Sequence, residues 1–188
     1  MDNLTRMILS RIREVIFGLE DGLVSTLGVI TGIAVGTQDR FVIILSGIVL
    51  VAVESLSMAA GTYLSNKSEA EANLARKAKH ALHKFIRLNH DQKGGPTKDA
   101  LAMGVAYIMG GAVPIVPYLI LPIQAALFVS IIATITTLFL VGVGKAKLTQ
   151  TNPLQSGFEM VTVSLSAAVL GFVIGKMASV IFPNMRTM

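Results

Sequence analysis

Long apolar blocks dominate the pattern of hydrophobic and polar positions along this chain. The blocks cover residues 15–36, 41–64, 100–120, 123–144 and 158–182. Each is long enough to cross a bilayer, because a spanning helix needs about 20 mostly apolar residues. The pattern therefore predicts an all-α polytopic membrane protein, built as a single domain of five transmembrane helices.

The connections between the blocks are marked by polar residues, Gly and Pro. Residues 36–40 are expected to form a tight loop, residues 117–122 a turn, and residues 145–153 the last link. Pro removes a backbone donor from a helix, so Pro114 is expected to kink the third span.

The longest connection, residues 66–98, is short and basic. Within it, apolar side chains recur at helical spacing at Leu74, Ala78, Ala81, Leu82, Phe85 and Leu88. This spacing indicates a cytoplasmic helical segment over residues 66–90. The segment either extends the second span into the cytoplasm or lies against anionic lipid.

Composition supports a membrane protein. The chain has 188 residues, of which 53% are hydrophobic and only 14% charged, whereas soluble domains carry roughly 25% charged residues. Mean hydropathy is +0.68. There are no cysteines, which excludes disulfides, thiolate metal sites and Cys nucleophiles.

The basic residues predict the orientation in the membrane. Of the 16 Lys and Arg residues, 13 lie before the first span, in residues 65–99, or in the connection 145–153. These segments share one side of a five-span protein, so the positive-inside rule places the N-terminus in the cytoplasm and the C-terminus outside. The net charge of +5 comes without any nucleic-acid recognition motif, and we expect no nucleic-acid partner.

Carboxylates within the spans are the main candidates for chemistry, because ionisable groups in a bilayer usually face a bundle interior or a water-filled path. At about 100° per residue, one face of the first span carries Glu14, Gly18, Asp21, Ser25, Gly28, Gly32 and Gly36. Glu20 lies off this face, where we expect it to snorkel or to pair with a nearby Arg.

We interpret the glycines of this face as residues that allow close packing against another helix. Gly28, Gly32 and Gly36 are spaced four residues apart, and small residues at this spacing let two helices approach closely. The same stripe could bring two copies together. We therefore expect a homodimer with the first span near its two-fold axis, since closed dimers are the commonest assemblies.

The second span adds Glu54 and, one turn on, Met58. Asp21 and Met58 each lie about six residues, or ~9 Å, from the cytoplasmic ends of their spans, and Glu159 lies near the cytoplasmic mouth of the fifth. Carboxylates bind hard cations and protons, while a thioether favours softer first-row metals. Two alternatives stay open: core packing for Met58, and a structural interhelical hydrogen bond for Asp21 or Glu54.

His80 and His83 form a weaker candidate. Their i, i+3 spacing suits a divalent metal, but Lys79 and Lys84 beside them repel cations, so a solvated surface is the favoured interpretation. No nucleophile–base pair is evident, and we expect no enzyme activity.

Four sequence stretches carry a family resemblance. In order, they are Phe17–Leu23 (FGLEDGL) with Gly28 and Gly32, Ser57–Ser65 (SMAAGTYLS) with Lys67–Glu69, Tyr107–Pro114 (YIMGGAVP) with Pro117, and Thr136–Gly142 (TTLFLVG). They resemble the first four helices of the vacuolar iron transporter family. The resemblance covers nearly the whole chain and is that of a short, prokaryotic-like member.

The resemblance implies a dimer of five-helix protomers with a metal path between them. It implies export of Fe²⁺, sometimes Mn²⁺, from the cytosol in exchange for protons, with no permanently bound cofactor. Asp21 and Met58 match the acid and thioether of the family's path. Glu54 lies in the same helix as a family acid, at a different spacing from Met58.

The connection between the second and third spans departs from the family. Metal-transporting relatives carry a glutamate-rich helical domain there with E-x-x-E spacing, whereas residues 66–98 are basic and contain no such pair. The leading hypothesis is a divalent transition-metal/proton antiporter whose partners are the metal, protons, the bilayer and a second copy. The alternative is a non-transporting accessory protein on the same fold. With no targeting extension, a prokaryotic plasma membrane is the expected location.

Overall fold

The computed structural model describes residues 3–81 and 96–182, with side chains described for 11–76 and 96–182. These residues form five helices and no strand: α1 (Asn3–Thr37), α2 (Arg40–Ala81), α3 (Pro96–Ile120), α4 (Ile123–Thr149) and α5 (Pro153–Ile181). All five are long and apolar enough to cross a membrane. The all-α fold with five predicted spans is thereby confirmed.

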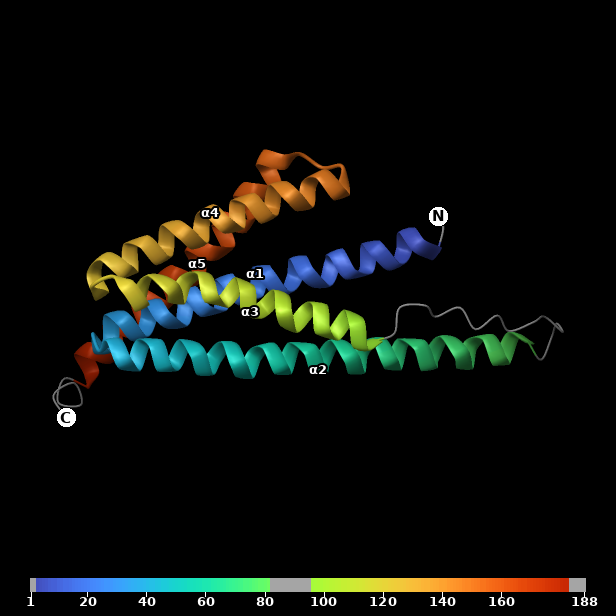
Figure 1. Cartoon of the computed structure of the whole chain (residues 1–188), viewed down its shortest axis with the longest axis horizontal. Helices are drawn as coiled ribbons and strands as arrows, with labels where there is room; N and C mark the ends of the chain where they lie inside the picture. The colour runs from blue at the N-terminus through green and yellow to red at the C-terminus, as the bar shows by residue number, and fades with distance from the viewer. Residues whose placement is uncertain (1–2, 82–95, 183–188) are drawn as a thin grey trace.

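The helices run alternately between two ends of an elongated bundle (Figure 1). We call the end where α1 and α3 begin the N-terminal end, and the end where α5 finishes the opposite end. The most extensive packing is of α1 against α3 and α5, and of α2 against α3. Thus α1 is the central element, and residues on its different faces meet different neighbours.

α2 is much longer than a membrane span. Its 42 residues extend about 63 Å at 1.5 Å per residue, roughly twice the ~30 Å hydrocarbon core. Its last turns therefore continue beyond the bundle at the N-terminal end, as Figure 1 shows. Of the two alternatives for residues 66–90, the described part follows the first, because the second span continues through Ala81 without a break.

Two predicted connections were too long. α3 continues through Pro117 to Ile120, and α4 continues to Thr149. Pro removes one backbone donor and crowds the carbonyl one turn before it, yet α3 contains both Pro114 and Pro117. The end of α3 is capped from α2: Arg40 Nε donates to the Tyr118 carbonyl oxygen at 2.7 Å, and its Nη2 donates to that of Leu119. These bonds satisfy carbonyls that a helix end leaves free.

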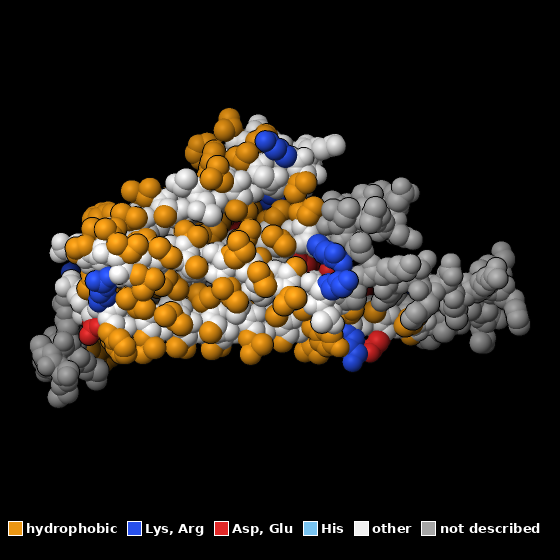
Figure 2. Space-filling model, viewed as in Figure 1, with side chains coloured by type: hydrophobic (Ala, Val, Ile, Leu, Met, Phe, Trp, Pro, Cys, Tyr) orange, Lys and Arg blue, Asp and Glu red, His pale blue; other side chains and the backbone are white. Residues whose placement is uncertain are grey.

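Hydrophobic side chains cover the middle of the visible face, and charged side chains lie near its two ends (Figure 2). On α2, for example, Leu45, Ile48, Val53 and Leu56 are all exposed. Soluble proteins rarely expose continuous apolar surface of this extent. The distribution is the one expected for helices that contact lipid.

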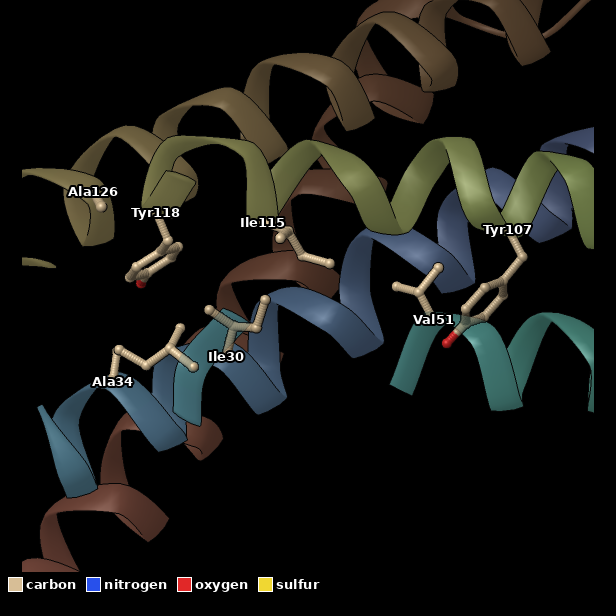
Figure 3. Close-up of a cluster of buried hydrophobic side chains, with 8 residues drawn as sticks. Ile30, Ala34, Val51, Tyr107, Ile115, Tyr118 and Ala126 are labelled. Carbon is tan, nitrogen blue, oxygen red and sulfur yellow. The ribbon is translucent and has the colours of Figure 1, made fainter. Parts of the chain in front are cut away.

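The largest core cluster joins four helices (Figure 3). It contains Ile30, Ala34, Ile43, Val51, Tyr107, Ile115, Tyr118 and Ala126. Both tyrosines are fully buried and come from α3. α3 is thus fixed between α1 and α2, and this position decides which of its polar groups reach the interior.

The glycine stripe of α1 packs within the chain. Small residues of α1 and α5 face each other in three pairs: Gly28 with Ala167, Gly32 with Gly171, and Gly36 with Gly175. A Cβ on Gly171 would overlap the Gly28 carbonyl oxygen, and one on Gly175 that of Gly32. The packing interpretation therefore holds within the chain, where the neighbouring helix is α5.

Candidate cation site between α1, α2 and α3

Asp21 lies where α1 and α3 approach most closely. A Cβ on Gly18 would lie 2.6 Å from the Met103 carbonyl oxygen, and one on Gly22 would overlap that of Tyr107. From the other side, a Cβ on Gly110 would lie 2.5 Å from the Leu19 carbonyl oxygen. Small residues allow this contact between helices in a membrane. The contact brings α3 beside the partly buried Asp21.

A hydrogen-bonded pair follows one turn beyond Asp21. The Ser25 hydroxyl donates to the Asp21 carbonyl oxygen at 2.5 Å, and its Oγ lies 2.7 Å from the hydroxyl oxygen of Tyr107. The Tyr107 side chain is fully buried. Figure 3 shows its ring extending from α3 toward α2, with the hydroxyl near Val51.

α2 adds a second carboxylate. Glu54 is partly buried and lies three residues after Val51, beside which the Tyr107 hydroxyl ends (Figure 3). Met58, one turn beyond Glu54, is partly buried and packs against the core cluster that contains Tyr107. The structure thus places Asp21, Glu54 and Tyr107 on three adjacent helices, with Ser25 bonded to both the Asp21 backbone and the Tyr107 hydroxyl, and with Met58 packed against the core cluster.

In the sequence, Tyr107 stands out only as the start of the family-like stretch Tyr107–Pro114, and its pairing with Ser25 is not predicted. The sequence feature that could have indicated the Ser25–Tyr107 pair is the additional Gly-x3-Gly spacing of Gly18 and Gly22. These two glycines flank Asp21 on the sequence and fix the position of α3.

Glu14 belongs to a different polar group, at the N-terminal end. It is 5% exposed and accepts a hydrogen bond from Arg13 Nη2 at 2.7 Å. It lies seven residues from Asp21, about 10 Å along the helix. The structure therefore separates Glu14 from the Asp21 group, although both are on α1.

The same end holds a second ion pair that joins three helices. Asp99 of α3 is 8% exposed; its Oδ1 lies 3.7 Å from Arg11 Nε of α1, and its Oδ2 accepts a hydrogen bond from Asn66 of α2 at 3.4 Å. Asp99 was not singled out from the sequence, because it stands at the polar edge of its span.

The other predicted residues lie apart from Asp21. Glu159 is exposed on α5 and accepts a hydrogen bond from Gln155 at 3.2 Å. Glu20 lines a cavity of about 240 Å³ between α1 and α4, together with Lys145. The side chain of His80 and the whole of His83 lie outside the described residues.

Within one copy the site is short of metal ligands. Among the described residues, no group of three or more His, Cys, Asp or Glu side chains is placed to hold a metal ion. Asp21 and Glu54 supply two carboxylates. Further ligands must come from other side-chain types, from water or from a second copy.

A groove begins beside the site and runs to the opposite end. It has a volume of about 850 Å³ and lies between α1 and α5. Its lining on α1 starts at Val24 and Ser25, includes the glycine stripe, and reaches Thr37. Ser25 therefore contacts both the groove and the Tyr107 hydroxyl.

These features define a class: a polytopic membrane protein with a carboxylate pair inside its helical bundle. The sequence profile of the VIT family matches residues 12–84 and 78–176. The chain belongs to this family, whose described relatives are transporters and not enzymes.

Three relatives illustrate the match. An uncharacterized protein of Methanocaldococcus jannaschii is 34% identical over 169 residues, covering 87% of this chain and 88% of its own length. Vacuolar iron transporter 1 of Eucalyptus grandis and that of Arabidopsis thaliana are each 24% identical, covering 88% of this chain and 85% of their own.

The plant relatives contain residues that this chain lacks. Each alignment runs over 213 positions, more than the 188 residues of the whole chain. The two segments of the family match overlap at residues 78–84, of which the first four belong to the last turn of α2.

Proposed function

We propose that the chain transports a divalent transition metal, iron or manganese, and exports it from the cytosol in exchange for protons. The observation that carries the proposal is that α1 and α2 each hold a partly buried carboxylate, Asp21 and Glu54, with Met58 one turn from Glu54 and packed against the core. The vacuolar iron transporters among its relatives support metal transport. The transported ion is Fe²⁺ or Mn²⁺, and no permanent cofactor is needed.

The chemistry of the pair suits exchange. Two carboxylates that share a site repel each other when both are ionised. Binding of either a proton or a cation relieves this repulsion. An entering divalent cation therefore releases bound protons, and arriving protons displace the cation. The Met58 thioether shifts preference toward first-row metals and away from Mg²⁺ and Ca²⁺.

The direction of transport follows from orientation. The basic residues at the N-terminal end of the bundle favour a cytoplasmic location for it, so the groove beyond Ser25 leads outward. Protons entering from outside through this groove would reach the carboxylate pair first. We propose the plasma membrane of a prokaryote as the location.

The active form in this proposal is a homodimer. One copy offers two carboxylates and a thioether, and a two-fold axis doubles each ligand. The groove between α1 and α5 is lined by small residues and begins at Ser25, so a second copy seated there would bring two sites toward one axis.

One observation favours a second candidate function. The plant relatives are longer within the matched region, and the family match divides at residues 78–84. If the missing segment is what collects metal from the cytosol, this chain would be a non-transporting accessory protein on the same fold.

Proteoliposomes test the proposal. Purified protein is reconstituted with a pH-sensitive dye inside, and influx of Fe²⁺ and Mn²⁺ is measured together with proton movement. Asp21→Asn removes charge and titration while keeping size, and it should abolish both fluxes. Glu20→Gln, the neighbouring carboxylate that faces α4, is the matched control and should transport normally. Equal transport by Asp21→Asn and wild type would favour the accessory function.

A further inference from the structure

The Tyr107 hydroxyl has a defined hydrogen-bond direction. A carbonyl oxygen can only accept, so the single Ser25 hydroxyl proton is donated to the Asp21 carbonyl oxygen, 2.5 Å away. Ser25 then has no proton left for its other neighbour. The 2.7 Å bond to Tyr107 is therefore donated by the phenol, since each hydroxyl carries one donor and two acceptor lone pairs.

This direction leaves the phenol oxygen as an acceptor only. Its proton is donated to Ser25, which also bonds the Asp21 backbone, and its lone pairs remain available near Val51, three residues before Glu54 (Figure 3). Three oxygen groups from three helices thus face one region, and when both carboxylates are ionised none of the three offers a proton to the other two. Such an arrangement is unfavourable when empty and favourable around a cation.

We propose that the Tyr107 hydroxyl oxygen is a third, neutral oxygen ligand of the transported cation, and that Ser25 is the residue that positions it. The inference rests on the proposed function, because it assigns a ligand to that same site. It also accounts for a costly feature: a fully buried hydroxyl beside two carboxylates.

A second tyrosine provides an internal comparison. Tyr118, eleven residues further along α3, is 1% exposed, and its hydroxyl has no hydrogen-bond partner among the described residues. Tyr118 therefore shows a purely packed tyrosine on the same helix, whereas Tyr107 is held by a specific bond beside two charges.

A neutral oxygen has a consequence for selectivity. It adds a hard ligand without adding a third negative charge. Loss of this ligand leaves the Met58 thioether with a larger share of the coordination, so binding of Mn²⁺ should weaken more than binding of the softer Co²⁺. Loss of one polar contact to a charged group is expected to weaken the affinity for the metal roughly 10-fold or more.

The experiment measures metal binding to full-length protein in detergent, by calorimetry with Mn²⁺ and by the visible absorption spectrum of bound Co²⁺, which reports its ligands. Tyr107→Phe removes only the hydroxyl. It should weaken Mn²⁺ binding roughly 10-fold or more and shift the Co²⁺ spectrum. Ser25→Ala should change both in the same direction, and the double variant should be no weaker than Tyr107→Phe. Tyr118→Phe, the matched control, should bind as wild type.

The outcomes distinguish failure of the Tyr107 assignment from failure of the proposed metal site. If Tyr107→Phe binds both metals with wild-type affinity and spectrum while Asp21→Asn loses binding, the Tyr107 assignment is wrong and the proposed site stands. If Asp21→Asn also binds as wild type, the proposed site itself is wrong. Should Tyr107→Phe fail to fold, Ser25→Ala decides: an unchanged affinity and Co²⁺ spectrum overturn the inference, and a shift in both supports it.

Discussion

Gly22 and Tyr107 are in such close backbone contact that a Cβ on Gly22 would overlap the Tyr107 carbonyl oxygen. This contact determines how far α3 stands from α1. It thereby sets the distance between the Tyr107 hydroxyl and Ser25, and it explains why the polar group forms at this level of the bundle.

Enlarging Gly22 should disturb both stability and the site. Gly22→Ala places a methyl group against backbone, which cannot move aside as a flexible side chain can. Overpacking of this kind costs about 1–3 kcal/mol, and we expect a lower thermal unfolding temperature in detergent together with weaker metal binding. Gly61 of α2 has open space around it, so Gly61→Ala should leave both unchanged. Normal stability of Gly22→Ala would mean that α1 and α3 stand further apart than the structure places them.

The spans could be predicted from the sequence because bilayer thickness fixes the length of an apolar block. Their ends could not. Polar residues outside the hydrocarbon core can remain helical, as in the first turns of α1 and the last turns of α2. Pro117 was placed in a turn, but it lies within α3 because Arg40 caps the helix end beyond it.

The site could be predicted in part. Helical phase and depth place Asp21 and Met58 at one level, with Glu54 one turn deeper, since each property belongs to a single helix. The contribution of Tyr107 depends instead on which face of α3 packs against α1. That choice is tertiary, and it rests on close contacts at Gly18 and Gly22 that the spacing of Tyr107 alone does not reveal.

Met58 should affect which metals are transported more than the rate of transport. Met58→Leu keeps the volume but removes the thioether, so transport of Fe²⁺ should weaken relative to Mg²⁺ and Ca²⁺. Competition assays in proteoliposomes measure this preference. Met109, which is 63% exposed on α3, is the matched control, and Met109→Leu should change nothing. An unaltered preference in Met58→Leu would assign Met58 to core packing.

Asp99 should stabilise the N-terminal end of the bundle. Asp99→Ala removes the carboxylate that forms the 3.7 Å ion pair with Arg11 Nε and accepts the hydrogen bond from Asn66. Loss of one member of a buried polar pair costs about 1–3 kcal/mol, which thermal unfolding in detergent would detect. Lys98→Ala, at the exposed neighbouring position, is the control. If both variants unfold at the same temperature, the ion pair contributes no net stability.

The orientation can be measured directly. The distribution of Lys and Arg predicts a cytoplasmic N-terminus and an external C-terminus. Reporter fusions active on only one side of the membrane should give opposite results at the two ends of the chain. Equal results would contradict a five-span topology, and reversed results would reverse the proposed direction of transport.

The groove between α1 and α5 predicts where two copies meet. Val29 is 39% exposed and lines this groove, and the chain contains no natural cysteine, so Val29→Cys introduces one thiol per copy. A disulfide requires Cα atoms within about 7 Å, a separation that equivalent residues reach only near a two-fold axis. Mild oxidation in membranes should therefore convert Val29→Cys to a covalent dimer. Ile132→Cys, 64% exposed on α4, should remain monomeric on a denaturing gel. The reverse pattern would move the interface to α4 and leave the carboxylate pair of each copy to bind its cation alone.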